Sequence, residues 1–315
     1  MATARAFVTG GSGMIGSLLV RRLLAQGAEV AVLSRPGANR VRLSDVGQDI
    51  EWIEADIRDA ARIGRALVQC RPTMVFHLAS TAFNPPTISL SEHLSVNTLG
   101  MVNLLEGLAS CPDARVIYAG SAAVYGSVSQ ASEDNACAPA TWLGATKAAG
   151  GTLLAAHSRI TGMRVIEMRI YTPYGPWERP TRLIPSIVLS ALDRHPVRTS
   201  KGTQRRDFLY IDDLLDAMLA AAALPGGGFD ILNIGSGEGV AIRDIVAKVL
   251  DLMGNPVKAD FGALPTRPDE ILEMSANISK AKSVLGWRPK VGLEEGLRQT
   301  VEWVAANPEL CRRLT

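Results

Sequence analysis

The sequence has no run of apolar residues that approaches the ~18 needed for a membrane-spanning helix. Its amino-terminal residues lead directly into a strand pattern, without the layout of a signal peptide. Cysteine and histidine are scarce, with four of each dispersed along 315 residues and none at metal-site spacings. Charge is balanced, since 33 basic residues face 31 acidic ones without a basic block. These absences predict a cytoplasmic protein with reduced thiols, and they argue against a membrane segment, a metal centre and a nucleic-acid surface.

Strand and helix patterns alternate through the first two thirds of the chain. Apolar runs of strand length are followed by segments with apolar residues at helical spacing. Several strands are apolar on both faces, which is typical of a parallel sheet covered by helices on both sides. The predicted strands are 5–10, 28–35, 50–57, 73–80, 115–126 (a strand, then a turn), 163–170 and 229–237, and the predicted helices are 14–27, 59–70, 89–110, 144–160 and 293–306.

This alternation predicts an α/β fold, a Rossmann-type doubly wound parallel sheet with a smaller, mixed C-terminal domain. The length also exceeds what one hydrophobic core usually carries. Proline and aromatic residues become frequent after residue 171, where the texture of the chain changes. We expect a dinucleotide-binding domain over 1–175, with a returning segment near 205–237, and a substrate-binding domain over 176–315. The second domain would cover the carboxyl ends of the strands, where open α/β sheets bind ligands.

A glycine-rich segment, TGGSGMIG, follows the first strand and opens the first helix. It contains Gly10, Gly13 and Gly16, with Met14 and Ile15 assigned to the same site. Glycine permits a tight turn there and lets the backbone approach a pyrophosphate at the helix N-terminus. The segment predicts a dinucleotide site, and the alternative is a tight strand-to-helix turn without a ligand.

The second strand ends in Leu33-Ser34-Arg35, without the carboxylate that usually bonds the ribose 2′-hydroxyl of NAD. Ser34 and Arg35, with Arg40 as a further candidate, would instead receive a 2′-phosphate. The cofactor is therefore expected to be NAD(P), with NADP favoured, unless Arg35 is simply a solvated loop residue. After the third strand, Asp56 either bonds the adenine or caps the helix that follows.

Eight motifs occur in a fixed order from about residue 4 to residue 303. They are TGGSGMIG, ADIRD, FHLAS, YAGSAAVYG, GATKAAG, YGP, RRDFLYIDD and RPDE. As a series they resemble the extended short-chain dehydrogenase/reductases that act on nucleotide sugars, the NAD-dependent epimerase/dehydratase group to which UDP-galactose 4-epimerase belongs. The resemblance implies hydride transfer at a sugar carbon, with a nucleotide sugar as substrate.

The resemblance assigns a catalytic role to three positions. Ser121 matches the residue that hydrogen-bonds the reacting sugar oxygen. Lys147 matches the lysine that holds the nicotinamide ribose and lowers the pKa of a tyrosine four residues earlier. At that earlier position the chain has Leu143, which has no proton to transfer.

Further positions match the cofactor and substrate contacts of the group. Arg206 and Arg267 match arginines that clamp the sugar diphosphate, and guanidinium groups suit phosphate oxygens. The group often has asparagine at the position of Thr172. Asp212 and Asp213 are expected to cap the start of a helix. The remaining implied cofactor contacts are Ile57, Leu78, Ala79, Ser80 and Tyr171, and Thr81 is an implied substrate contact.

Three interpretations of Leu143 stay open. It is a variant substitution in an otherwise ordinary epimerase or 4-keto-sugar reductase, or another group such as Ser121, Tyr125 or a water carries the proton, or the protein binds its ligands without turnover. The last would make it a non-catalytic NAD(P)-binding sensor or scaffold. The choice among epimerisation, reduction and dehydration also stays open. Small and apolar residues on the helices near 90–109 and 144–160, together with the resemblance, predict a homodimer through a four-helix bundle.

Overall fold

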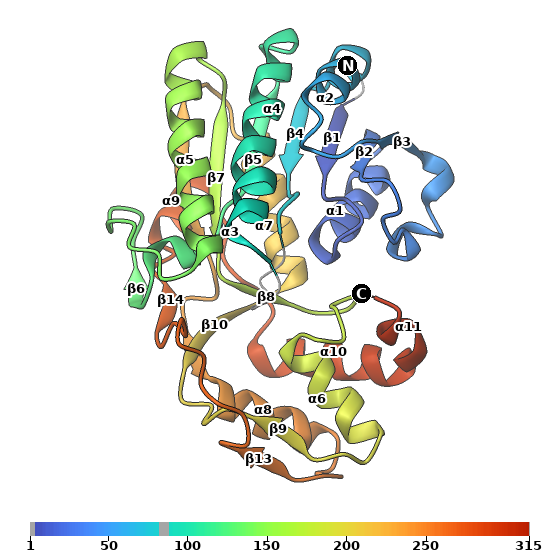
Figure 1. Ribbon diagram of the computed structural model, residues 1–315, viewed down its shortest axis with the longest axis vertical. Helices are drawn as coiled ribbons and strands as arrows, with labels where there is room; N and C mark the ends of the chain where they lie inside the picture. The colour runs from blue at the N-terminus through green and yellow to red at the C-terminus, as the bar shows by residue number, and fades with distance from the viewer. Residues whose placement is uncertain (1–3, 82–87, 315) are drawn as a thin grey trace.

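The computed structural model describes residues 4–81 and 88–314. Its centre is a seven-stranded sheet whose neighbouring strands are all parallel, in the order β11-β7-β5-β4-β1-β2-β3 (Figure 1). The order reverses direction between β1 and β4, as in a doubly wound sheet, and the predicted fold class is confirmed. The strands are β1 (Arg5–Thr9), β2 (Glu29–Ser34), β3 (Ile50–Glu54), β4 (Met74–His77), β5 (Arg115–Ala119), β7 (Val165–Ile170) and β11 (Phe229–Ile234).

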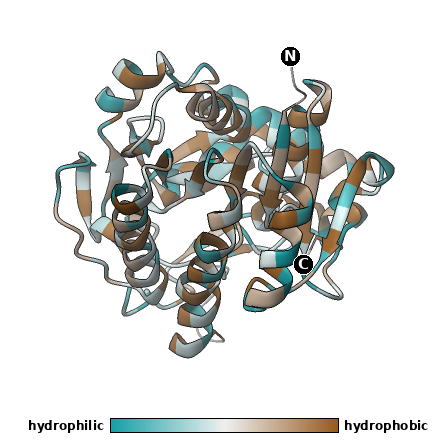
Figure 2. Ribbon diagram, turned by 90° about the horizontal axis from the view of Figure 1, so that it is seen from above, coloured by the Kyte–Doolittle hydropathy of each residue, from teal (hydrophilic) through white to brown (hydrophobic). Residues whose placement is uncertain are grey.

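Helices cover both faces of this sheet (Figure 2). On one side α1 (Met14–Ala25) packs against α7 (Ile211–Ala223), and on the other α2 (Ala60–Cys70), α4 (Gly100–Gly107) and α5 (Trp142–Thr161) pack together. The interior strands are buried almost throughout, including every residue of β7, whereas the edge strands β3 and β11 are only partly buried. Burial on both faces explains why the strands are continuous apolar runs rather than alternating ones.

The predicted helix over 89–110 is continuous, but its hydrogen-bonding pattern changes along its length. It consists of α3 (Leu90–His93), a π-helical stretch (Leu94–Leu99), α4 and a 3-10 turn (Leu108–Ser110). The buried Asn97 amide lies in the π-helical stretch and donates to the hydroxyls of Thr81 and Thr146, each at 3.0 Å. A π-helical turn often marks a functional site because it redirects such a side chain.

Most of the chain after residue 175, apart from α7, α9 (Ser279–Leu285) and β11, forms a second layer below the sheet (Figure 1). Its helices α6 (Leu183–Leu192), α8 (Ile242–Leu252) and α10 (Leu293–Ala306) pack on one another. The segment 205–237 is divided: β10 (Arg205–Tyr210) pairs with β8 (Thr172–Tyr174) and β12 (Gly239–Ala241), whereas β11 joins the main sheet. The other elements are β6 (Val128–Ala131) paired with β14 (Met274–Ala276), β9 (Val197–Thr199) paired with β13 (Ala259–Phe261), and α11 (Pro308–Arg312).

Within residues 4–81 and 88–314, no helix has both the length and the apolar character needed to cross a membrane.

Candidate functional site

The glycine loop between β1 and α1 is held against the segment that follows β4. Gly10 has φ +71°, and a Cβ there would lie 2.7 Å from backbone atoms of Leu78 and Ala79. A Cβ at Gly16 would collide with the carbonyl oxygen of Gly10. The loop therefore requires glycine at both positions, for conformation at the first and for space at each.

The N-terminus of α1 carries no anion of its own. Gly13 is the N-cap residue, it makes no side-chain cap, and the first turn has no acidic residue. The amides of this turn, including those of Met14 and Ile15, lie within the glycine loop. A helix N-terminus of this kind favours a phosphate group, so these residues fit the pyrophosphate of a dinucleotide.

Hydrogen bonds join the carboxyl end of β1 to the segment that follows β4. The Thr9 hydroxyl accepts from the backbone nitrogens of Leu78 and Ala79, each at 3.1 Å, and lies 2.8 Å from Nδ1 of His77. Next to it, the carboxamide oxygen of Asn97 accepts from the hydroxyl of Ser80. The same oxygen accepts from the backbone nitrogen of Thr81.

Two arginines follow β2: Arg35 is exposed, and Arg40 forms an ion pair. Ser34 is buried, with no partner for its hydroxyl among the described residues, whereas Arg35 is exposed. Arg40 pairs with Glu54 at 2.8 Å and stacks over the ring of Trp52. Arg35 is therefore the better placed of the two arginines to receive a 2′-phosphate.

Asp56 does not cap α2, so that interpretation was wrong. The cap is Asp59, whose carboxylate accepts from the backbone nitrogen of Arg62. Asp56 instead accepts from the guanidinium of Arg58 at 2.8 and 2.7 Å, and this hydrogen bonding holds its pKa below the usual range. The neighbouring Ile57 is buried against Gly100. An adenine contact by Asp56 or Ile57 stays a prediction.

Ser121 and Tyr125 begin and end the turn that follows β5. The Ser121 hydroxyl accepts from the backbone nitrogen of Ala123 at 3.2 Å, which fixes its rotamer while leaving its own proton to donate. The Tyr125 hydroxyl donates to Oδ1 of Asn233 at 2.8 Å, and burial raises its pKa to about 12. Of the two residues, Ser121 is the better placed to donate a proton.

The start of α5 contains the leucine and the lysine of the sequence motif. Thr141 caps the helix, and Leu143 follows in its first turn, half-buried. The Lys147 side chain is 4% exposed, and its ammonium donates to the carbonyl oxygen of Ala119 at 2.7 Å. Burial lowers the pKa of Lys147 to about 8, against the opposing effect of Glu167. Contact with a cofactor ribose stays a prediction.

The predicted diphosphate arginines converge on one carboxylate. Arg206 and Arg267 both form ion pairs with the buried Glu270, the second at 3.1 Å. Two cations against one anion leave a net positive charge, which suits a phosphate ligand.

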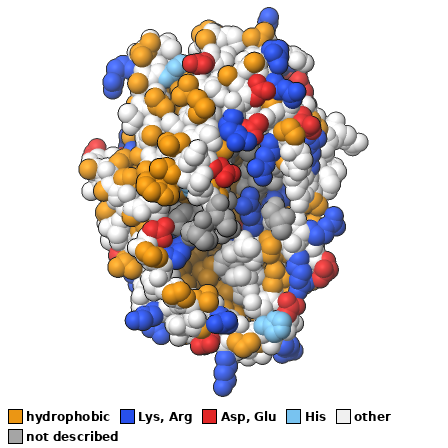
Figure 3. Space-filling model, in the orientation of Figure 1, with side chains coloured by type: hydrophobic (Ala, Val, Ile, Leu, Met, Phe, Trp, Pro, Cys, Tyr) orange, Lys and Arg blue, Asp and Glu red, His pale blue; other side chains and the backbone are white. Residues whose placement is uncertain are grey.

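Thr172 is half-buried in β8, and the Tyr171 ring packs with apolar side chains that include Ala122 and Ile278. Figure 3 shows a hollowed face with lysine and arginine side chains along one flank.

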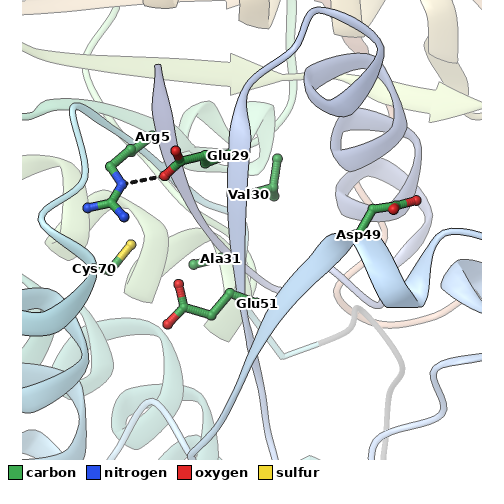
Figure 4. Close-up of a pocket in the computed structure, with 7 residues that line it drawn as sticks. All are labelled: Arg5, Glu29, Val30, Ala31, Asp49, Glu51 and Cys70. Atoms are coloured by element: carbon green, nitrogen blue, oxygen red, sulfur yellow. Dashed lines mark hydrogen bonds and ion pairs between the residues drawn. The ribbon is translucent and has the colours of Figure 1, made fainter. Parts of the chain in front are cut away.

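A separate cavity lies at the amino ends of β1 and β2, on the side of the sheet opposite to the glycine loop. It measures about 230 Å³, and Figure 4 shows Arg5 and Glu29 joined across it, with Cys70 nearby. Burial raises the pKa of Cys70 to about 11, so its thiol is protonated and unreactive. No residue predicted for the site lines this cavity.

Two buried arrangements escaped the sequence analysis. The guanidinium of Arg42 donates to the carbonyl oxygens of Ser12 and Trp177, which ties the glycine loop to the segment after residue 175. Beneath α5, the carboxylate of Glu167 lies next to Arg169 in the centre of β7. The second arrangement had a visible signal, since a glutamate interrupts the apolar run VIEMRI; the first had none.

Residues 6–235 match the NAD dependent epimerase/dehydratase family. A UDP-glucose 4-epimerase of Mycolicibacterium smegmatis is 30% identical to the chain, over 95% of this chain and 98% of the relative. A probable dTDP-glucose 4,6-dehydratase of Sinorhizobium fredii is 30% identical, over 96% and 93%. Among solved structures, the NAD complex of the Thermus thermophilus UDP-glucose 4-epimerase superposes with a TM-score of 0.87 and 29% identity, over 96% and 99% of the two chains.

Proposed function

This chain belongs to the NAD-dependent epimerase/dehydratase family, and from that premise we propose that it transfers a hydride at a carbon of a nucleotide sugar. The proposed reaction is an epimerisation or a 4-keto-sugar reduction, with Leu143 where the resemblance expects tyrosine. The observation that carries the proposal is the placement of the glycine loop and Lys147 at the carboxyl ends of two strands of one sheet, β1 and β5, which are separated only by β4. The loop follows β1, and Lys147 bonds the last residue of β5, Ala119.

The residues present fit a dinucleotide, because the α1 N-terminus is free of acidic side chains and Gly10 leaves no room for a Cβ. A bound nicotinamide would supply the hydride acceptor and donor. Lys147 would hold the cofactor ribose by its ammonium. Ser121 would donate its proton to the reacting sugar oxygen, since its rotamer is fixed by the bond from Ala123. Leu143 would shield this region from bulk water without moving a proton, so Ser121 or a water would carry it.

The substrate diphosphate would lie against Arg206 and Arg267. Both guanidinium groups already pair with Glu270, so an incoming phosphate would find them oriented, and Arg206 is also largely withdrawn from water. Binding would then exchange one anionic partner for another at the same arginines. Thr81 and Thr172 would contribute neutral hydroxyl contacts.

For the cofactor we propose that NADP(H) binds at least as tightly as NAD(H). The support is the exposed Arg35 beside the buried Ser34, at a strand end with no carboxylate. An acidic residue there would repel a 2′-phosphate, whereas an arginine attracts it.

We also propose a homodimer through the helices 90–107 and α5. The two segments pack side by side, and their outer faces expose large apolar side chains. Leu153 and Ile160, the latter 83% exposed, lie seven residues apart on one face of α5. Leu94 and Leu99 are exposed on the neighbouring helix. Light scattering at micromolar concentration tests this, and a monomer would contradict it.

A non-catalytic NAD(P)-binding protein is the second candidate. Leu143 offers no acid or base, and the Lys147 ammonium is bonded to Ala119 rather than directed into open space. The two candidates separate in one experiment: UDP- and dTDP-sugars are added to the cofactor complex while the nicotinamide absorbance is followed. Turnover or transient reduction supports the enzyme, whereas binding by thermal shift without any absorbance change supports the sensor.

A further inference from the structure

Glu167 is a charged residue in the middle of an interior strand. It lies on β7, between β5 and β11, and is 1% exposed. Burying a carboxylate is costly unless cations and hydrogen bonds compensate it. The proposed reaction has so far given this residue no role, so its position requires an explanation.

The space around this carboxylate is made by glycine. A Cβ at Gly151 of α5 would lie 2.5 Å from Oε2 of Glu167, and one at Gly120 would lie 3.1 Å from Oε1. Gly151 follows Lys147 by four residues, so both face the same side of α5. The carboxylate of Glu167 therefore lies under the helix face that presents the lysine.

Charged and polar side chains from β4, β5 and β7 surround Lys147. We call Tyr118, Lys147, Glu167 and Arg169 the buried polar cluster. The Lys147 ammonium lies 4.7 Å from the ring centroid of Tyr118, which stacks on His77 of β4 at 5.6 Å. Arg169 bonds Glu167 through Nε at 3.2 Å.

Hydrogen bonding in this cluster is incomplete. Among the described residues, the Tyr118 hydroxyl, Oε2 of Glu167 and Nη1 of Arg169 have no partner, and the Lys147 ammonium donates to Ala119. The negative charge of Glu167 raises the pKa of Lys147, although the two groups form no direct ion pair among the described residues. His77 is neutral, because burial lowers its pKa to about 3.

We propose that Glu167 is a positioning residue for Lys147, whose counter-charge keeps this lysine an ammonium beneath the cofactor ribose. The proposal rests on the proposed function for the ribose contact. In a site where Leu143 stands one turn earlier, no tyrosine hydroxyl is available at that position to share the lysine proton. The counter-charge then comes from below, through β7, instead of from the helix itself.

Burial and Glu167 act in opposite directions on the pKa of Lys147. Burial prevails and lowers this pKa to about 8. Removing the negative charge therefore lowers the pKa further, and the ammonium is lost at a lower pH. Cofactor binding that depends on the ammonium weakens as pH rises, earlier in the variant than in the wild type.

The first experiment measures the lysine directly, without cofactor. The side-chain carbon signals of 13C-labelled lysine are titrated with pH, and Lys147→Arg assigns the signal of Lys147. We expect Glu167→Gln to lower the Lys147 pKa by up to about one unit, since the carboxylate opposes the effect of burial but is already paired with Arg169. Glu167→Asp, which keeps the charge, should remain closer to the wild type than Glu167→Gln does.

The matched control is Glu178→Gln. Glu178 is also a buried glutamate paired with an arginine, Arg182 at 3.1 Å, but it does not influence Lys147. If Glu167→Gln fails to fold, Glu167→Leu combined with Arg169→Leu replaces the ion pair by apolar side chains, an exchange that is often tolerated. This double variant also removes the cation of Arg169, 3.2 Å from Glu167, so it should lower the Lys147 pKa relative to the wild type by less than loss of the carboxylate alone.

The second experiment measures the Kd of NADH and NADPH from pH 6 to 9. In folded Glu167→Gln, the pH at which affinity begins to fall should move down by the same amount as the lysine pKa, with little change at pH 6. An unchanged Lys147 pKa in that variant would overturn the inference. A shifted pKa with an unshifted affinity profile would overturn its cofactor part. Failure of the wild type to bind either nucleotide at any pH would instead overturn the proposed function.

Discussion

The glycine loop follows β1, whereas the buried polar cluster lies on β5, β7 and α5 of the same domain, and different forces hold the two. The loop is fixed by space: at Gly10 and Gly16 a single added carbon meets backbone atoms. The cluster is fixed by charge, because Lys147, Glu167 and Arg169 are buried together and Glu167 forms an ion pair with Arg169. Any side chain at Gly10 or Gly16 would collide with backbone atoms, so substitutions there are expected to destabilise the loop. In the buried polar cluster, substitutions that keep the charge of the side chain are expected to be better tolerated.

This difference indicates which half of the site is able to vary within one fold. The loop would bind a part of the cofactor that is the same in every reaction, and its backbone leaves no freedom. The region of Leu143, Ser121 and Lys147 would set the chemistry, and it depends on side chains whose roles neighbours are able to take over. A departure from the family pattern is therefore expected there rather than in the loop.

The largest effect is expected from introducing a phenol at the start of α5. Leu143→Tyr should raise kcat on a nucleotide sugar that the wild type turns over by ~10²–10⁴, the usual contribution of acid–base catalysis. Cofactor affinity should change little, because the glycine loop and Lys147 supply it. Steady-state kinetics and cofactor titration measure both quantities.

Leu143→Phe is the matched control, since it adds the ring without the hydroxyl. It should leave kcat near the wild-type value. If the tyrosine variant is no faster than the wild type, Leu143 is native to the mechanism and Ser121 is the next residue to replace. Equal gains in both variants would show that packing, not proton transfer, is responsible.

Arg206→Ala should weaken binding of UDP- or dTDP-sugars by about 2–5 kcal/mol, because it removes one charged partner of a desolvated phosphate. Arg205→Ala is the control, since that neighbouring arginine is exposed and pairs with Glu273. Calorimetric titration compares the two. Equal, small effects of both variants would refute the assignment of Arg206 to the diphosphate.

Gly10→Ala tests the steric half of the comparison, with Gly27→Ala as its partner. Both glycines have positive φ, +71° and +76°, but a Cβ at Gly27 meets nothing within 4 Å among the described atoms. Gly27→Ala should cost about 1–2 kcal/mol of unfolding free energy, from conformation alone. Gly10→Ala should cost clearly more and should also weaken cofactor binding. Chemical denaturation measures the costs, and similar losses would show that the close approach to Leu78 is relaxed.

The smallest effect is expected at the end of β2. Arg35→Ala should weaken NADP(H) binding roughly tenfold, the size of one hydrogen bond to a charged group, and leave NAD(H) binding unchanged. Arg40→Ala should do neither, because Arg40 is engaged by Glu54 and Trp52. A clear preference for NAD(H) that persists in Arg35→Ala would defeat the proposed cofactor choice.

Much of the fold could be predicted from local pattern. All seven strands of the main sheet, and helices such as α1 and α10, coincide with predicted segments, because an interior strand and an amphipathic helix carry their burial in their own residues. Small elements such as β8, β12 and β14 were not predicted, since three-residue strands form only where distant segments supply a partner. Asp212 and Asp213 were expected as helix caps, and that expectation was wrong, because the N-cap of α7 is Tyr210. Asp212 pairs with Arg22. The carboxylate of Asp213 accepts from the backbone nitrogens of Lys290 and Val291.

The sequence alone determined the sheet, the glycine loop and the candidate residues Ser121, Leu143 and Lys147, because each depends on spacing within one short segment. Only the tertiary structure decided what surrounds them. Glu167 is twenty residues from Lys147 in the chain, and it comes to lie beneath that lysine because β7 passes under α5. Charge interactions act through space and a buried medium strengthens them, so the state of a buried lysine is set by the packing of distant strands, which no local pattern records.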